Sequence, residues 1–227
     1  MNLFLIAIMK ISQWIYLNSS LDKLTKKRFK KILAQESAKI IVTQGIENFS
    51  DAKNKAAKNL NIENLGCLPS NYEIEKSLKE HYQLFVPVTH AEYVALMRAT
   101  AIEIMNLFTD FQAYAVGPVV SGTASSTSSI NIHLGSEDVY DVTYILDKNE
   151  IKYKFFDKKI KFNKKVKKVF CGVSLLYRNM VVEIVMFNSK DIKQCPLSRI
   201  DGKPIKRLKI NSLKKLLWAY YRFSIET

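Results

Sequence analysis

The sequence has few of the residues that define disulfide-rich, zinc-binding or low-complexity proteins. Its 227 residues include three cysteines, seven glycines and five prolines. Cys67, Cys171 and Cys195 are widely spaced and form no CxxC pair, so we expect neither a disulfide framework nor a zinc site. This cysteine usage fits a reducing compartment, and we therefore expect a cytoplasmic protein.

Long hydrophobic runs and phosphate-loop motifs are also missing. The opening MNLFLIAIM is apolar, but Lys10 and Gln13 interrupt it well before the roughly 20 residues that a membrane span needs. It lacks the basic start and the small-residue cleavage site of a signal peptide. We interpret residues 1–22 as an N-terminal extension without stable membrane insertion, with a membrane tether as the alternative. The absence of a GxxxxGK[ST] pattern excludes the P-loop class of nucleotide-binding proteins.

Acidic residues are scarce relative to basic ones. There are 35 lysines and arginines against 21 acids, which gives a formal net charge of +14. The segment from Lys148 to Lys168 holds ten lysines against Glu150 and Asp157, a local balance of 10 − 2 = +8. Such a balance favours an anionic partner, above all nucleic acid, and the alternative is a plain solvated surface.

Hydrophobic residues recur at helical spacing early in the chain and alternate later. We expect helices over 23–44, after Ser50, after a capping box formed by Ser70 and Glu73, and from a second capping box at Thr89 and Glu92 to Phe108. Strands are expected around 112–120, 129–134, 151–155, 169–176 and 180–187, with a helix capped by Ser136 and a C-terminal amphipathic helix. The prediction is an α+β fold in three parts: the extension 1–22, a helical region 23–88, and a domain 89–227 in which helices flank a mixed β-sheet.

The stretch from Gln112 to Leu134, QAYAVGPVVSGTASSTSSINIHL, is predicted to organise this domain. It indicates a strand that contains Ala115, Val116, Val119 and Val120, a turn of small residues, and a second strand. In the second strand Ile130, Ile132 and Leu134 are expected to face a core. Alternation then places Ser129, Asn131 and His133 together on the opposite face.

This layout resembles the nucleotidyltransferase superfamily that includes DNA polymerase β. In that family a Gly-Ser or Gly-Gly turn holds the nucleotide phosphates, and an acid-apolar-acid strand holds two Mg²⁺ ions. Gly122-Thr123 stands at the turn, whereas Ser129 and Asn131 stand where the two acids are expected. Together with AKNKAAKNL and LPSNYEIEKSL, the stretch is also similar to a group of small proteobacterial proteins that have a helical N-terminus before such a domain.

The resemblance implies a degenerate member of the superfamily that binds nucleotide or RNA without catalysis. Neutral Ser129 and Asn131 cannot supply the charge that a Mg²⁺ pair needs, so no catalytic or metal-binding residue is assigned, although nucleotide with Mg²⁺ is the cofactor the family implies. The residues expected at the nucleotide are Gly122, Thr123, Ser129, Asn131, His133 and Glu183, the last at the position of the family's third acid. For each a structural role is the alternative: a flexible turn, a solvent-facing strand edge, or an acid paired with a lysine.

An active nucleotidyltransferase is the alternative function, with Glu183 joined by Glu137 or Asp138 as an atypical acid set. For nucleic acid, the residues expected to contact phosphates are Lys158, Lys159, Lys164 and Lys165. The interleaved aromatic residues Tyr153, Phe155, Phe156 and Phe162 are expected to point into the core and not to stack on bases. RNA is favoured over DNA because members of the superfamily often act on RNA ends.

Overall fold

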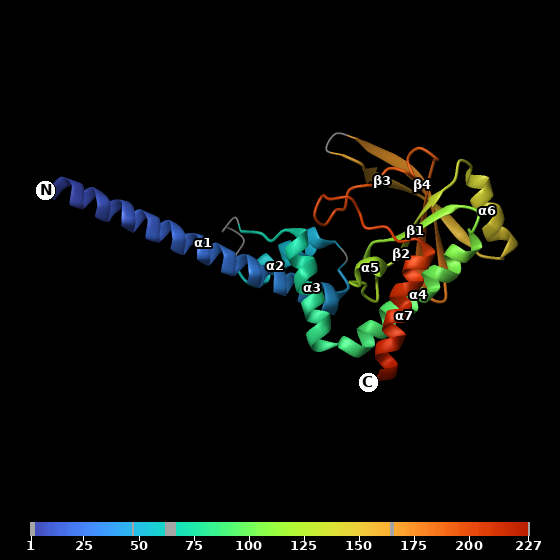
Figure 1. Cartoon of the computed structure of the whole chain (residues 1–227), viewed down its shortest axis with the longest axis horizontal. Helices are drawn as coiled ribbons and strands as arrows, with labels where there is room; N and C mark the ends of the chain where they lie inside the picture. The colour runs from blue at the N-terminus through green and yellow to red at the C-terminus, as the bar shows by residue number, and fades with distance from the viewer. Residues whose placement is uncertain (1–2, 47, 62–66, 164–165, 227) are drawn as a thin grey trace. The chain divides into compact units, whose positions relative to one another are not determined.

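The structure, a computed structural model, describes residues 3–46, 48–61, 67–163 and 166–226, with side chains of 3–22 and 223–226 left aside. The chain divides into two compact units, Met1–Leu78 and Lys79–Thr227 (Figure 1). We expect a boundary after residue 88 from the sequence, whereas the units divide within helix α3 (Asn71–Phe85).

The first unit is helical, as predicted. Helix α1 covers Leu3–Gln44 and not only 23–44, since no proline or glycine precedes Gly45, which ends it with φ of 65°. It packs on α2 (Phe49–Asn59), and the buried side chains there include Leu33, Ile40, Ile41, Ala52 and Ala56.

The predicted capping box is present at the start of α3. The Ser70 amide donates to Glu73 Oε2 at 2.7 Å, and the Glu73 amide donates to Ser70 Oγ at 3.2 Å. Two backbone donors that the helix leaves unpaired are thus satisfied reciprocally. Helix α2, in contrast, is capped by Asn48, whose side chain accepts from the Ser50 amide at 2.9 Å, and not by Ser50 itself.

The second unit contains a five-stranded mixed sheet with flanking helices, which confirms the α+β class. Its elements are α4 (Pro87–Leu107), β1 (Gln112–Val116), α5 (Pro118–Ser121), β2 (Ile130–Gly135), α6 (Val139–Lys148), β3 (Tyr153–Lys161), β4 (Lys167–Tyr177), β5 (Met180–Phe187) and α7 (Ile210–Glu226). The strand order is β1-β2-β5-β4-β3. Only the β2–β5 pair among these strands is parallel.

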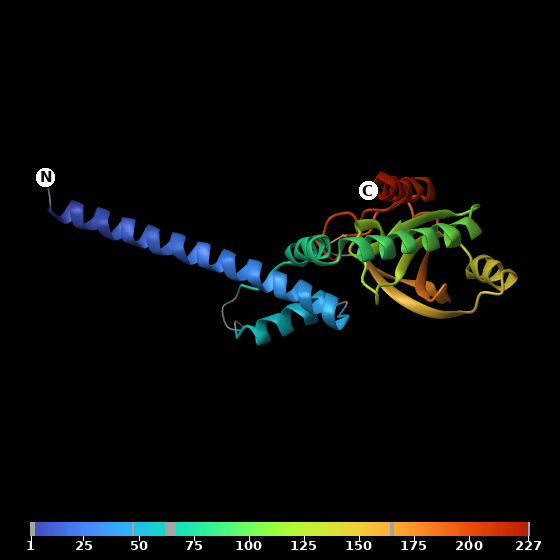
Figure 2. The ribbon, with the colours of Figure 1, turned by 90° about the horizontal axis from the view of Figure 1, so that it is seen from below.

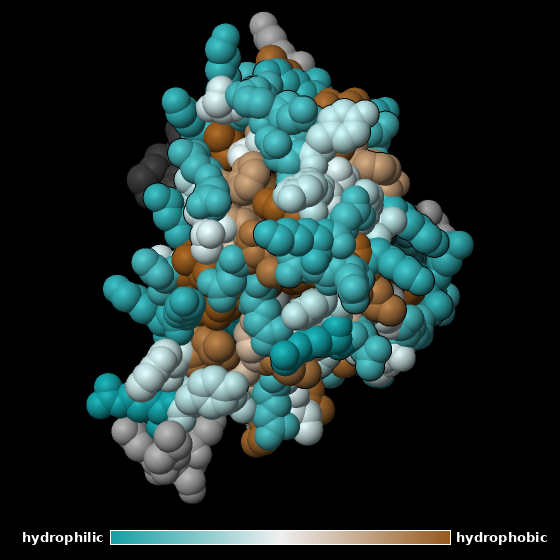
Figure 3. Space-filling model, turned by 90° about the vertical axis from the view of Figure 1, so that its right-hand side faces the viewer, coloured by the Kyte–Doolittle hydropathy of each residue, from teal (hydrophilic) through white to brown (hydrophobic). Residues whose placement is uncertain are grey.

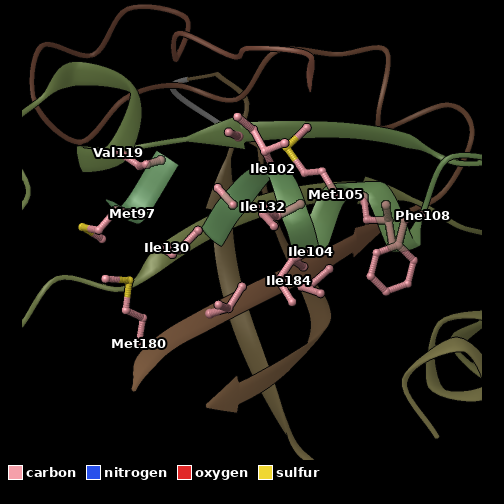
Figure 4. Close-up of a cluster of buried hydrophobic side chains, with 14 of the residues drawn as sticks. Met97, Ile102, Ile104, Met105, Phe108, Val119, Ile130, Ile132, Met180 and Ile184 are labelled. Atoms are coloured by element: carbon pink, nitrogen blue, oxygen red, sulfur yellow. The ribbon is translucent and has the colours of Figure 1, made fainter. Parts of the chain in front are cut away.

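One face of the sheet carries the main core. Ile130, Ile132 and Leu134 of β2 are fully buried there, as the alternation predicts. They join apolar side chains of α4 and β5 such as Ile104 and Ile184 (Figure 4). Helix α4 is buried on several sides because α7 packs alongside it (Figure 2). Each fully buried aliphatic side chain stabilises the fold by about 1.5–3 kcal/mol.

Three local predictions are wrong. Val119 and Val120 do not extend the first strand, because Gly117 (φ of 73°) and Pro118 begin the short helix α5. Helix α4 begins at Pro87, two residues before the predicted Thr89 cap. The cap of α6 is Asp138, whose Oδ1 accepts from the Tyr140 amide at 2.9 Å; Ser136 Oγ donates instead to the Asp138 carbonyl at 2.6 Å.

The opposite face of the sheet is covered in part by a smaller, largely aromatic core. Its buried residues are Ile160, Phe162, Phe170, Val185, Phe187 and Ile192. The Phe156 ring lies over Gly172 of the neighbouring strand β4, its register partner. A Cβ at Gly172 would lie 2.6 Å from Phe156 Cζ and 2.9 Å from the Ile184 carbonyl oxygen. Only a residue without a side chain at position 172 therefore leaves room for the Phe156 ring to lie over β4.

Within the described ranges, no helix combines the length and the apolar character needed to cross a membrane. On the face in Figure 3, hydrophobic side chains are spread in small groups among a hydrophilic majority. Single exposed apolar groups of this kind are normal on a protein surface.

We predict that Gly172→Ala destabilises the second unit by about 2–3 kcal/mol, since the added methyl overlaps a ring and a backbone oxygen. Thermal or urea unfolding measures this change. Adding Phe156→Leu is expected to restore only part of the stability, because the Ile184 carbonyl stays in place. Ser174→Ala, on the same face of β4, serves as the control within about 0.5 kcal/mol of wild type; an equally small effect of Gly172→Ala would contradict the prediction.

Candidate functional site

Polar residues meet on the aromatic-core face, at the end of the sheet that this core leaves open. Asn131 of β2 and Glu183 of β5 are direct register partners, and Ser174 of β4 is in turn the partner of Glu183. Asn131 Nδ2 donates to the Ser129 carbonyl at 3.1 Å and lies 3.3 Å from Ser129 Oγ. The structure thus brings together Ser129, Asn131 and Glu183, the three positions at which the sequence resemblance places acids.

The ammonium group of Lys158 lies among these residues. Its Nζ donates to Asn131 Oδ1 at 2.8 Å and to Glu183 Oε2 at 2.6 Å. The side chain starts on β3 and crosses β4. Its Nζ lies 5.9 Å from the centre of the Phe156 ring. The Lys158 and Glu183 side chains are only 28% and 29% exposed, so solvent screens the ion pair incompletely.

This ion pair decides the electrostatics of the site. One carboxylate and one ammonium cancel, and Ser129 and Asn131 are neutral, so the four side chains carry no net charge. The Lys158 ammonium already occupies Asn131 Oδ1 and Glu183 Oε2, the oxygens to which another cation could bind. The prediction that Glu183 pairs with a lysine is confirmed. Lys158, expected to contact nucleic-acid phosphates, is instead half-buried in this ion pair, because residues 156, 158 and 160 share the partly covered face.

His133 follows Asn131 on the same face, but it is buried and not solvent-facing. Its ring lies 4.7 Å from the ring of Phe187 and opposite Tyr114 in the register with β1. Nδ1 has no hydrogen-bond partner. Burial, helped by the nearby positive charges of Lys158 and Arg207, lowers the pKa of His133 to about 3. His133 is thus a neutral residue of the aromatic core, beneath the polar residues.

Gly122 and Thr123 make different contacts from those of the polar residues. Both of their backbone amides donate to the Pro118 carbonyl, at 2.8 and 3.2 Å, so these two N–H groups are occupied within the turn. Thr123 Oγ1 lies 2.7 Å from Ser121 Oγ. A Cβ at Gly122 would lie 3.6 Å from Nη2 of Arg98 on α4. The residue that approaches Asn131 is Gly117, where a Cβ would lie 3.8 Å from Asn131 Nδ2.

The carboxylates of the alternative acid set have separate partners. Glu137 Oε1 accepts from the Ser189 amide at 2.7 Å, and Asp138 caps α6. Glu137 comes after the register pair Gly135–Phe187. That pair lies four residues along the strands from the pair Asn131–Glu183, a distance of roughly 13 Å. Among the residues that the structure describes, no group of three His, Cys, Asp or Glu side chains is placed to hold a metal ion.

Two of the lysines predicted to contact nucleic acid, Lys158 and Lys159, are neighbours in β3, so their side chains point to opposite faces of the sheet. Lys159 is exposed and projects from the sheet face opposite to that of Lys158. Lys164 and Lys165 lie outside the described residues. The expectation that the aromatic residues all point inward is wrong for Phe155, whose side chain is 58% exposed on this edge strand.

Two features of the site were not inferred from the sequence: the part played by Lys158 and the aromatic cover of His133. The first had a signal, because Lys158 lies two residues from both Phe156 and Ile160 and therefore shares their face in a strand. The second depends on Ile192 and on Phe187 of β5, which reach this face only through the tertiary fold.

No protein-family model, curated protein or solved structure matches this chain.

We predict that the second unit loses stability as the pH falls from about 6.5 towards 3, and that His133→Leu removes much of this loss. The unfolded chain binds a proton near pH 6.5, whereas folded His133 does so only near 3, so protonation favours the unfolded state. The unfolding free energies of wild type and variant should diverge by about 4 kcal/mol by pH 3. Urea unfolding across pH measures this, with the other acid-sensitive groups common to both proteins. Parallel pH curves would show that His133 is protonated in the folded protein.

Proposed function

We propose that this protein binds single-stranded nucleic acid, RNA in preference, without catalysing nucleotidyl transfer. We call the proposed interface the β3–β4 surface. It lies on the sheet face that carries the main core, on the edge strand β3 and its neighbour β4, and it reaches the end of the pair where Lys161 faces Lys167. It is formed by Phe155, Lys159, Lys161, Lys167 and Val169, with Asp157 as the one acid among them.

The observation that carries the proposal is a set of three lysines without acidic partners. Lys161 and Lys167 stand directly opposite each other in the antiparallel register, and Lys159 is next along the same face. Among the described residues, no carboxylate lies within ion-pair distance of these three. Like charges opposed across a strand pair destabilise it, and a phosphate backbone placed over them would relieve the repulsion.

Apolar side chains beside these lysines favour a single strand over a duplex. Phe155 is 58% exposed and Val169 is 57% exposed, and Val169 is the register partner of Lys159. The Tyr153 ring packs against Phe155 edge-on, with ring centres 5.5 Å apart. An exposed ring supported in this way offers a flat face on which an unpaired base can stack, worth about 1–3 kcal/mol.

The absence of catalysis is proposed from the polar residues around Lys158. Nucleotidyl transfer needs a negatively charged cluster that holds metal ions at the phosphates. Here the net charge is zero, and the ammonium group of Lys158 lies against the available oxygens. The resemblance to nucleotidyltransferases is then one of chain layout, with binding as the proposed activity.

We predict that Lys159→Glu, Lys161→Glu and Lys167→Glu together weaken binding of a single-stranded RNA at about 50 mM salt by a hundredfold or more, on the order of a few kcal/mol. Each neutralised phosphate contributes about 0.7 to the salt dependence of the affinity, so loss of three contacts lowers the slope by about 2. Fluorescence anisotropy across a salt series measures both. Phe155→Ala should weaken binding about tenfold with the salt slope unchanged, since stacking is not electrostatic.

The matched control is Lys203→Glu, Lys206→Glu and Lys214→Glu, which makes the same charge change at exposed positions of the same unit. It should reduce affinity far less than the β3–β4 triple variant. Equal effects would show a diffuse attraction by net charge, and absence of binding by wild type would overturn the proposal.

We predict no Mg²⁺-dependent release of pyrophosphate from ATP, GTP, CTP or UTP, with or without an RNA acceptor. The reason is the neutral polar cluster, in which Glu183 is paired with Lys158. A coupled pyrophosphate assay measures this, with Glu183→Gln as the matched protein. Release by wild type that is lost in Glu183→Gln would establish the alternative function, an active transferase with an atypical acid.

A further inference from the structure

A cavity of about 290 Å³ lies in the second unit, away from the β3–β4 surface. It is bounded by the end of α3, the first half of α4, the α5 turn and α7. Lining residues that bear on its chemistry are Lys79, Tyr82, His90, Arg98, Ser121 and Tyr220. This volume is at the lower end of the range for pockets that bind small molecules.

The distinctive group in this cavity is the guanidinium of Arg98. It is partly buried, and burial lowers its pKa. Its Nε donates to the Val119 carbonyl at 3.2 Å, which fixes the side chain across the α5 turn. Among the described residues, no carboxylate pairs with it. A partly desolvated cation without a counter-ion is costly, so the site favours an anion.

The surrounding residues add positive charge and donors, and no acid lines the cavity. Lys79 supplies a second ammonium group, and Ser121 supplies a hydroxyl held 2.7 Å from Thr123 Oγ1. His90 stacks on Tyr82 with ring centres 3.5 Å apart, and its Nε2–H donates to the Ala124 carbonyl at 2.9 Å. Burial lowers the pKa of His90, so this ring forms a neutral, flat wall at pH 7.

We propose that this cavity binds a phosphomonoester, with the Arg98 guanidinium and the Lys79 ammonium holding the phosphate. The planar guanidinium fork matches two phosphate oxygens, and a second cation suits a dianion better than a singly charged carboxylate. The Tyr82–His90 stack and Tyr220 give the wall against which the body of the ligand packs. The phosphate belongs either to a free small molecule or to the phosphorylated end of a nucleic-acid strand.

The test is isothermal titration of the full chain at low salt with AMP, with inorganic phosphate and with adenosine. We expect saturable binding of AMP, weaker binding of phosphate and none of adenosine. Arg98→Gln should weaken AMP binding by about tenfold or more, as loss of a charged hydrogen-bond pair implies. A short RNA with a 5′-phosphate, compared with its 5′-hydroxyl form, separates a strand end from a free nucleotide as the source.

Two further variants keep the test decisive if Arg98→Gln unfolds. Ala91→Leu fills the cavity without changing a charge and should also abolish AMP binding. Arg178→Gln removes an arginine that pairs with Glu103 outside the cavity and should leave AMP binding unchanged. Failure of AMP and phosphate to bind, or equal losses in Arg98→Gln and Arg178→Gln, would overturn the proposal.

The outcome is independent of the proposed RNA interface. The Lys159, Lys161 and Lys167 charge reversals lie outside the cavity and should leave AMP affinity within about twofold. Arg98→Gln should likewise leave the binding of a 5′-hydroxyl RNA intact. Each site can therefore fail without the other.

Discussion

Strand β2 lies between β1 and β5, and both of its faces are at least partly covered, which constrains every residue along it. Ile130, Ile132 and Leu134 must be apolar because they face the main core. The residues between them, Asn131 and His133, are then forced onto the second face, whatever their polarity. A shift of one residue in register would bury the polar set under α4, so the alternation fixes the register as well as the site.

The second face deals with these forced polar groups in two ways. His133 is held neutral under the Phe187 ring. Asn131, next to Glu183, instead accepts a hydrogen bond from the ammonium of Lys158, which starts on β3, two strands from Glu183 and three from Asn131. This contact needs a long, flexible side chain that crosses β4, where the glycine at position 172 leaves room for the Phe156 ring. Breaking the ion pair would leave a partly buried charge without a partner, so its two halves depend on each other.

The fold class and most of the strands could be predicted from the sequence because period-two alternation is clear in β2 and at the start of β3, whereas β4 and β5 are apolar runs separated by a short turn. The boundaries were harder where single residues decide the backbone. Gly117 and Pro118 turn Val119 and Val120 from strand to helix, although their hydrophobicity fits either. For the site, the facing positions along β2 and the face of Lys158 on β3 could be predicted. The partners of Lys158 could not, because the local sequence of β3 does not show that β5 and β2 lie beyond β4.

The surplus positive charge is sorted by whether the fold itself supplies a counter-ion. Lys158 pairs with Glu183, Lys168 with Asp191 and Arg178 with Glu103, and these cations stabilise the protein from within. Lys159, Lys161, Lys167 and Arg98 have no such acid among the described residues. The first three lie together on an open strand surface, which suits an extended polyanion, whereas Arg98 lines a bounded cavity, which suits a compact one. The net charge of +14 is therefore less informative than the places where the fold leaves charge uncompensated.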